Sequence, residues 1–321
     1  MTTPAVSQAA PDLATIRAAH GRIAPRIHHT AVITCASLDE IAGARLFFKC
    51  ENLQKTGSFK IRGATNAVFS LTQEEARNGV VAPSSGNHAA ALALAARWRG
   101  IPAYIVMPSN SSPAKKRAVE NYGGKITESE PNVASREAVC AAVMRETGAL
   151  LVHPYNDARV IAGQGTAALE LLEEIPDLDF IITPVSGGGL LSGTAIAAKS
   201  VRPQIKVVGG EPRNADDVSR SLASGKIEPA SRFETLADGL RATLCPLTFS
   251  ILRERVDLVS LVDEGEIVNS MLLLWERAKL VVEPSGAVAA APALLRRIGA
   301  ERKKVGVILS GGNLDLRHLP F

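Results

Sequence analysis

Short apolar runs alternate with longer stretches of helical periodicity along most of this chain. Seven short runs predict strands: Leu46–Cys50, Val80–Ala82, Ala103–Met107, Phe180–Val185, Lys206–Gly210, Leu258–Val262 and Val305–Leu309. Longer stretches with helical spacing of apolar residues predict helices: Ile61–Leu71, Asn87–Arg99, Pro113–Tyr122, Val133–Thr147, Ile161–Glu174, Ala215–Ser224 and Glu264–Leu280. Strands that alternate with helices of about 10–15 residues are typical of βαβ units with parallel strands. The pattern therefore predicts an α/β protein.

Three polar, glycine-rich segments each follow a predicted strand: residues 84–88, 186–190 and 310–313. In open α/β sheets, ligands bind beyond the carboxyl ends of the strands. These segments and the turn before Lys60 are therefore predicted to line one shared cleft. The 321 residues also allow two domains, because single cores rarely grow beyond about 250–300 residues.

Lys60 lies between the turn Thr56-Gly57-Ser58 and a predicted helix. The first turn of a helix carries partial positive charge, which disfavours a protonated amine. This position suits a neutral lysine that forms a Schiff base with a carbonyl compound. A solvated surface lysine is the ordinary alternative.

The segment from Ser186 to Gly193 reads Ser-Gly-Gly-Gly-Leu-Leu-Ser-Gly and connects a predicted strand to a helix. Its unhindered backbone amides can bind a phosphate group at the start of that helix, although glycine-rich turns without function are common. The glycine spacing is one residue too long for a dinucleotide fingerprint, and no Gly-Lys-Ser/Thr ending marks a P-loop. A small phosphorylated cofactor is the ligand that the segment favours.

Two further segments carry polar side chains. Ser84 and Ser85 precede an alanine-rich helix that begins at Asn87 and His88, where donors can bind an anion such as a substrate carboxylate. A plain helix N-cap is the alternative. Ser310 ends a buried strand, and its hydroxyl can meet a ring nitrogen or serve only a turn.

The composition narrows the class of protein. Hydrophobic residues make up 46% and charged residues 21%, which is ordinary for a globular protein. The net charge of +4 is scattered and aromatic residues reach only 4%, so nucleic acid is not an expected partner. No run of about 18 apolar residues predicts a membrane span.

The cysteines and the N-terminus indicate a cytoplasmic protein. Cys35, Cys50, Cys140 and Cys245 are far apart and have no Cys-x-x-Cys spacing, so reduced thiols are expected. The segment Met1–Pro11 lacks the basic and then apolar pattern of a signal peptide and is interpreted as a frayed leader.

Four motifs in this order and spacing carry a resemblance: Thr-Gly-Ser-Phe-Lys-Ile-Arg-Gly, Ser-Ser-Gly-Asn-His, Ser-Gly-Gly-Gly-Leu-Leu and Ser-Gly-Gly-Asn. The chain resembles the serine/threonine dehydratase and serine racemase group of pyridoxal-phosphate enzymes, which have the tryptophan-synthase-β-like fold (fold type II). Matching segments extend from Glu51 to Asn313. The resemblance implies two domains, each with a twisted, mostly parallel sheet flanked by helices. A large cofactor-binding domain is expected at residues 1–73 and 158–321, and a small mobile domain at 74–157.

The resemblance also implies roles for the residues of the cleft. Lys60 would hold pyridoxal phosphate as a Schiff base and later remove the substrate α-proton. The other implied cofactor-binding residues are Phe59, Asn87, Gly187, Gly188, Gly189, Leu190 and Ser310. The implied substrate-binding residues are Ser84, Ser85, Asn87, His88 and Arg136. A serine hydroxyl does not keep the pyridine nitrogen protonated as a carboxylate would, which favours β-elimination.

The implied activity is that of an ammonia-lyase (dehydratase). It would convert L-serine, L-threonine or a related 3-hydroxy amino acid to a 2-oxo acid and ammonia. Ser85 matches the acid/base residue of serine racemases, so racemisation is a possible side activity. Ala242, however, replaces a serine of the racemases.

Several alternatives remain open. Arg136 can pair with a second carboxylate, so a 3-hydroxyaspartate dehydratase is the nearest one. A nucleotide-dependent oxidoreductase is disfavoured by the glycine spacing, and a non-catalytic metabolite-binding protein is disfavoured by Lys60.

Further expectations follow from the same resemblance. Glu211, the Ala215 carbonyl and Asp217 match a divalent-cation site, whose hard oxygen ligands suit Mg²⁺, Ca²⁺ or Mn²⁺. An acidic helix start is the alternative. Nucleotide contacts are only partly matched, because Cys35 and Ala36 replace hydroxyl residues. A homodimer acting on a small amino acid is expected.

Overall fold

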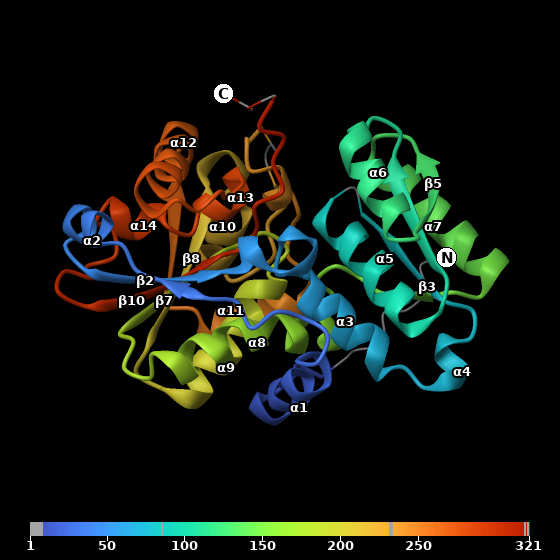
Figure 1. The fold of residues 1–321 in the computed structure, drawn as a ribbon, viewed down its shortest axis with the longest axis horizontal. Helices are drawn as coiled ribbons and strands as arrows, with labels where there is room; N and C mark the ends of the chain where they lie inside the picture. The colour runs from blue at the N-terminus through green and yellow to red at the C-terminus, as the bar shows by residue number, and fades with distance from the viewer. Residues whose placement is uncertain (1–8, 85, 231–233, 318, 320) are drawn as a thin grey trace.

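The protein contains two sheets, which lie on either side of helix α3 (Figure 1). The computed structural model describes residues 9–84, 86–230, 234–317, 319 and 321. The first sheet has the strand order β1 (Val32–Ile33), β2 (Arg45–Cys50), β10 (Lys304–Leu309), β7 (Phe180–Pro184), β8 (Lys206–Pro212) and β9 (Leu258–Val262). The second has the order β5 (Lys125–Ser129), β4 (Ala103–Pro108), β3 (Val80–Pro83) and β6 (Leu150–Leu151). Every pairing is parallel except that of β1 with β2.

The α/β class and all seven predicted strands are confirmed, and three strands were not predicted. Strands β1 and β6 have two residues each, which is too short for a periodic signal. Strand β5 has the sequence Lys-Ile-Thr-Glu-Ser and lies at a sheet edge, where most of its side chains stay accessible. Its polar composition therefore gives no buried-strand pattern.

The α-helices are α1 (Leu13–Ile23), α2 (Ala36–Ala42), α3 (Lys60–Ser70), α4 (Gln73–Ala76), α5 (Asn87–Arg99), α6 (Pro113–Asn121), α7 (Val133–Thr147), α8 (Ala158–Glu174), α9 (Gly189–Val201), α10 (Asp217–Ser224), α11 (Pro246–Arg255), α12 (Glu264–Leu273), α13 (Pro284–Ala287) and α14 (Ala291–Leu294). The helix expected to reach Leu280 is wrong at its end. A π-helical turn at Leu274–Ala278 follows α12, and Lys279 then takes a left-handed conformation with φ of 59°. The interpretation of Met1–Pro11 as a frayed leader concerns mostly residues outside the described part.

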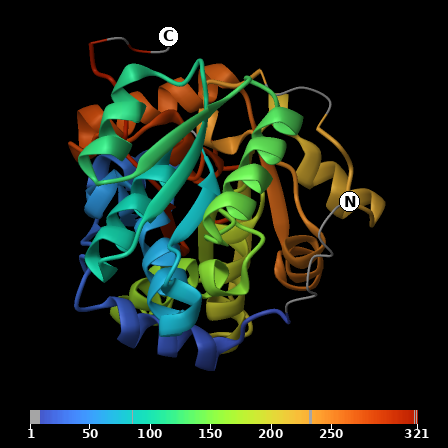
Figure 2. The same cartoon turned by 90° about the vertical axis from the view of Figure 1, so that its right-hand side faces the viewer.

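Helices cover both faces of each sheet. Ile181 of β7 packs in a core cluster with α8, α9 and α11, whereas the next residue, Ile182, packs in the cluster on the opposite face with α12 and α14. In the smaller sheet, α7 lies across one face (Figure 2), and α3 and α5 pack on the other. The domain boundaries at residues 74 and 157 stay a prediction.

Helix α8 fixes the spacing of two helices whose first residues line the predicted cleft. A Cβ atom at Gly163 would lie 2.6 Å from the Cα of Gly63 in α3, and one at Gly165 would lie 2.8 Å from the carbonyl oxygen of Gly193 in α9. The backbones of α3 and α9 therefore contact α8 with no side chain between them. This packing sets the distance between Lys60, at the start of α3, and the glycine-rich segment before α9.

No helix in the described part of the chain is long and apolar enough to cross a membrane. All four cysteines are free thiols.

Candidate active site

Lys60 begins helix α3 beside the end of strand β10. The amide of Phe59, the residue before it, donates a 3.0 Å hydrogen bond to the carbonyl oxygen of Ser310. Ser58 forms an isolated bridge with Gly311, and the Gly312 amide donates to the Gly57 carbonyl at 2.9 Å. The turn before Lys60 and the 310–313 segment are thus hydrogen-bonded together, as the shared-cleft prediction requires.

The side-chain amine of Lys60 has an environment that favours its neutral form. Burial lowers its pKa from 10.5 to about 8. Its Nζ atom donates to the carbonyl oxygen of Pro154 at 3.3 Å and lies 5.0 Å from the centre of the Phe59 ring. Within the described part of the chain, no carboxylate lies within ion-pair distance of this amine. A neutral amine at this position is a nucleophile and a base.

The 186–190 segment is held by a hydrogen bond at its first residue and is closely packed by its neighbours. The Ser186 hydroxyl accepts from the Ala242 amide at 3.0 Å. Gly188 has φ of 87°, a left-handed conformation that favours glycine. A Cβ atom at Gly187 would lie 2.6 Å from the ring of Tyr155, so this position has no room for a side chain. The first amides of α9 lack intrahelical acceptors and are free to bind an anion.

The 84–88 segment meets the 310–313 segment through Asn87. Its Nδ2 atom donates to Glu283 Oε1 at 2.8 Å, and its Oδ1 atom accepts from Asn313 Nδ2 at 2.8 Å. Ser85, predicted as a catalytic and substrate-binding residue, lies outside the described residues. The Ser84 amide donates to the Val106 carbonyl at 3.0 Å, which holds this segment against β4.

His88 is buried in the first turn of α5. Its Nε2 atom lies 2.9 Å from the Val152 carbonyl oxygen, and its Nδ1 atom has no hydrogen-bond partner among the described residues. Burial first, and the nearby charge of Lys60 second, lower the pKa of His88 to about 3. The imidazole is therefore neutral, with Nε2 as the donor.

A comparison with known proteins identifies the family. The family described as "Pyridoxal-phosphate dependent enzyme" matches residues 23–311. The chain belongs to this pyridoxal-phosphate dependent family. Its sequence is 52% identical to the serine racemase of Oryza sativa subsp. indica over 312 residues, which cover 96% of this chain and 92% of that protein. It is 48% identical to the beta-hydroxyaspartate dehydratase of Paracoccus denitrificans over 304 residues, which cover 95% and 96% of the two chains.

The solved structures agree with this assignment. Maize serine racemase superposes with a TM-score of 0.94 at 50% identity, covering 96% of this chain and 95% of that chain. The resemblance to the dehydratase and racemase group, drawn from four short motifs, is confirmed, as is the α/β fold of type II.

The residues of the cleft fit pyridoxal phosphate. Lys60 offers the cofactor's aldehyde an amine whose pKa is lowered to about 8, which favours the neutral form that reacts. The segment from Gly187 to Leu190 offers backbone amides where a side chain at Gly187 or Gly188 would collide with neighbours. The Ser310 carbonyl accepts from the amide of Phe59, next to Lys60, and Asn87 is linked to the 310–313 segment through Asn313. The individual roles of these residues stay predictions.

Arg136 of α7 lies near His153 and Tyr155, the two neighbours of Pro154, which accepts a hydrogen bond from Lys60. Its positive charge acts to lower the pKa of both His153 and Tyr155. Burial first, and the charge of Lys60 second, lower the pKa of His153 to about 4, and Arg136 adds to this effect. Among the described residues, no carboxylate forms an ion pair with Arg136, and its role in substrate binding stays a prediction.

The predicted cation ligands lie together at the end of β8. Glu211 accepts from the amides of Val218 and Ser219 at 2.8 and 2.9 Å, and burial raises its pKa to about 8. Asp217 has a buried Oδ2 atom without a hydrogen-bond partner among the described residues, and burial raises its pKa to about 6. In the described part of the chain, no three His, Cys, Asp or Glu side chains converge as a metal site. A cation held by two carboxylates and the Ala215 carbonyl stays a prediction.

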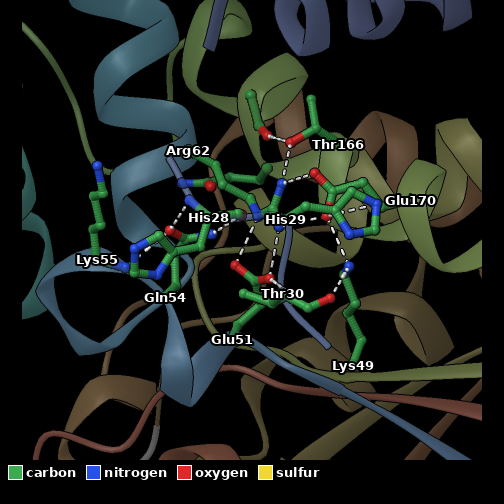
Figure 3. Close-up of polar contacts among 12 residues, drawn as sticks. His28, His29, Thr30, Lys49, Glu51, Gln54, Lys55, Arg62, Thr166 and Glu170 are labelled. Atoms are coloured by element: carbon green, nitrogen blue, oxygen red, sulfur yellow. Dashed lines mark hydrogen bonds and ion pairs between the residues drawn. The ribbon is translucent and has the colours of Figure 1, made fainter. Parts of the chain in front are cut away.

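A buried charge network around Arg62 was not predicted (Figure 3). Arg62, two residues after Lys60, forms ion pairs at 2.7 Å with both Glu51 and Glu170. Lys49 pairs with Glu170 at 2.7 Å, so two cations balance two carboxylates. Burial opposes ionisation of Glu170, but hydrogen bonds from His20 and Arg62 lower its pKa. The signal in the sequence was Lys49, a charged residue inside a predicted buried strand.

Glu283 is the other functional residue that the sequence motifs missed. Its carboxyl accepts from Asn87, and a Cβ atom at Gly311 would lie 2.4 Å from its Oε1 atom. Burial, and then the charge of Asp238, raise its pKa to about 8. A carboxyl group that stays protonated near neutral pH thus lies beside Asn87.

Proposed function

We propose that this protein is a pyridoxal-phosphate-dependent ammonia-lyase. It would convert L-serine, L-threonine or a related 3-hydroxy amino acid to a 2-oxo acid and ammonia by β-elimination. The observation that carries the proposal is the amine of Lys60, which has a pKa lowered to about 8 and lies beside the Ser310 strand end. The 52% identity to a serine racemase and the 48% identity to a dehydratase support the substrate class.

When bound, pyridoxal phosphate supplies an aldehyde for amines and a conjugated ring that withdraws electrons from the substrate α-carbon. Lys60 and Phe59 would hold it at the start of α3, and Asn87 and Ser310 would bind its polar ring substituents. The amides of residues 187–190 would bind its phosphate at the start of α9.

The substrate carboxylate would bind at the start of α5, with Ser84, Asn87 and, by the resemblance, Ser85 as its donors. His88 would stabilise this binding site, because its neutral ring donates a hydrogen bond from the first turn of α5 to the Val152 carbonyl. The bound carboxylate would then orient the α-hydrogen toward Lys60.

Lys60 moves the proton. Its Nζ atom, whose pKa burial lowers to about 8, would accept the α-proton of the substrate when it is in the neutral form. Closure of the small domain at 74–157 would exclude water while this happens. Ser85, on the other side of the cleft by the resemblance, would return a proton in a racemase side reaction.

Three finer properties belong to the same proposal. Mg²⁺ would bind Glu211, Asp217 and the Ala215 carbonyl, and the unpartnered Oδ2 atom of Asp217 supports such a ligand set. The protein would act as a homodimer in the cytoplasm.

A 3-hydroxyaspartate dehydratase is the second candidate. The charge of Arg136 favours it, because an arginine pairs bidentately with a second carboxylate. The related dehydratase of Paracoccus denitrificans also favours it.

Two measurements test these proposals. The purified protein should have a visible absorbance band that disappears on borohydride treatment. Peptide mapping should then find the reduced cofactor attached to Lys60. Production of 2-oxo acids from L- and D-serine, L-threonine and the 3-hydroxyaspartate isomers, with and without Mg²⁺, ranks the substrates. Absence of the band from a folded protein supplied with pyridoxal phosphate would refute the cofactor assignment.

A further inference from the structure

Tyr155 packs directly on the glycine-rich segment 186–190. It lies in the connection between β6 and α8. A Cβ atom at Gly187 would lie 2.6 Å from three atoms of the Tyr155 ring, Cγ, Cδ1 and Cε1. A Cβ atom at Gly189 would lie 2.9 Å from the Cβ of the same tyrosine. The tyrosine therefore occupies the space that side chains at Gly187 and Gly189 would need.

Gly188, between these two glycines, has different neighbours. A Cβ atom at Gly188 would lie 2.8 Å from Cβ of Thr248 and 2.9 Å from Cδ2 of Leu244. Both residues lie at or near the start of α11. The backbone of the segment thus packs against Tyr155 at Gly187 and Gly189, and against Thr248 with Leu244 at Gly188.

The tyrosine is itself fixed in place. Its ring meets the ring of His153 edge to face, with the centres 4.6 Å apart and the planes at 87°. His153 Nδ1 accepts from the amides of Tyr155 and Asn156 at 3.4 and 2.9 Å. Pro154, the residue between His153 and Tyr155 in the sequence, accepts the hydrogen bond from Lys60 through its carbonyl oxygen. One short segment therefore contacts both Lys60 and the glycine backbone.

We infer that Tyr155 is a positioning residue that holds the amides of residues 187–190 in their phosphate-binding conformation. This inference rests on the proposed function, because it assumes that these amides bind the phosphate of the cofactor. Consecutive glycines have more backbone freedom than any other sequence, and ordering them opposes binding. A rigid ring packed on the segment removes the competing conformations before the ligand arrives.

The first test compares two ligands that differ only in the phosphate. Pyridoxal phosphate and pyridoxal are titrated, by absorbance, into cofactor-free wild-type protein and into Tyr155→Ala. The variant should bind pyridoxal phosphate roughly tenfold more weakly and pyridoxal as the wild type does. Tyr155→Phe, which keeps the ring, should restore the affinity. If Tyr155→Ala does not fold, Tyr155→Leu, which removes the planar ring but keeps much of the volume, serves the same comparison.

The second test uses the steric relationship itself. Gly187→Ala should strongly weaken binding of pyridoxal phosphate, and adding Tyr155→Ala should recover part of the loss, because the ring that opposes the new methyl group is gone. Gly188→Ala is the matched control. Its methyl group would meet Thr248 and Leu244 instead, so Tyr155→Ala should not rescue it.

The outcomes separate the inference from the proposed function. If the wild type binds pyridoxal phosphate but Tyr155→Ala loses affinity for both ligands equally, or for neither, the inference is overturned alone. Equal rescue of Gly187→Ala and Gly188→Ala overturns it too. If the wild type binds no pyridoxal phosphate, the proposed function fails and the inference fails with it.

Discussion

The Nδ2 atom of Asn87 donates a 2.8 Å hydrogen bond to the carboxyl group of Glu283, 196 residues away in the sequence. Burial, and then the charge of Asp238, raise the pKa of this carboxyl from 4.5 to about 8. The folded chain therefore holds a proton on Glu283 that the unfolded chain releases above about pH 4.5. Ionisation of Glu283 thus opposes folding as the pH rises toward about 8.

Glu283→Gln should remove this dependence, because the amide cannot ionise and still accepts from Asn87. We expect the free energy of unfolding to fall less steeply for the variant than for the wild type between pH about 4.5 and about 8. Urea denaturation at several pH values measures the slope. Glu74→Gln, at an exposed position, is the control and should keep the wild-type slope. Equal slopes for Glu283→Gln and the wild type would contradict the raised pKa.

The pKa of Lys60 predicts how the protein takes up its cofactor. Since burial lowers this pKa to about 8, the neutral fraction of the amine should fall about tenfold for each pH unit below that value. The rate at which cofactor-free protein forms a borohydride-fixable adduct with pyridoxal phosphate should follow the same curve. Lys60→Ala should form no adduct while keeping its circular dichroism spectrum. A rate that rises only near the ordinary pKa of 10.5 would show that the amine is not desolvated.

Local signals in the sequence were enough to predict the cleft but not the contacts that hold it. Lys60 and the three polar segments follow strands, and parallel strands bring their carboxyl ends together, so the shared location could be inferred. The partners of these residues lie in other segments. Arg62 and Glu170 are 108 residues apart, and nothing in the spacing of charges along the chain pairs them.

Close packing between distant segments could not be predicted from the sequence either. The sequence suggested that the glycines at 187–189 leave backbone amides open for a phosphate. It gave no indication that the ring of Tyr155 occupies the space beside Gly187, because that contact depends on the path of the connection between β6 and α8. A conformational requirement such as the positive φ of Gly188 is also a property of the folded loop.

The buried network of Arg62 predicts a large effect on stability. Arg62→Leu would leave Glu51 and Glu170 buried without their shared cation, and removing one member of a buried ion pair costs about 3–5 kcal/mol. Urea denaturation at neutral pH measures the change. Arg77→Leu removes an exposed arginine that pairs with Glu74 and should change stability by less than about 0.5 kcal/mol. Similar effects of the two substitutions would mean that the network contributes no more than a surface pair.

Arg136 predicts which substrate the cleft prefers. If the second carboxylate of a diacid pairs with this side chain, Arg136→Ala should lower kcat/KM for 3-hydroxyaspartate by roughly 10- to 100-fold and for L-serine far less. Arg145→Ala, on the exposed side of the same helix, is the matched control and should affect neither substrate. Equal losses for the diacid and for serine would remove the support for a hydroxyaspartate dehydratase.

The end of β8 predicts a stabilising effect of Mg²⁺. A cation bound by Glu211, Asp217 and the Ala215 carbonyl binds the folded chain only, so millimolar Mg²⁺ should raise Tm by a few degrees. Asp217→Asn should abolish the rise, because it neutralises the carboxyl group that has an unpartnered buried oxygen. Asp216→Asn removes the same charge one residue away, from a carboxylate that pairs with Arg220 at 2.9 Å, and should keep most of the rise. If Asp216→Asn and Asp217→Asn reduce the rise equally, the effect comes from general negative charge at this helix start and not from a coordinated ion.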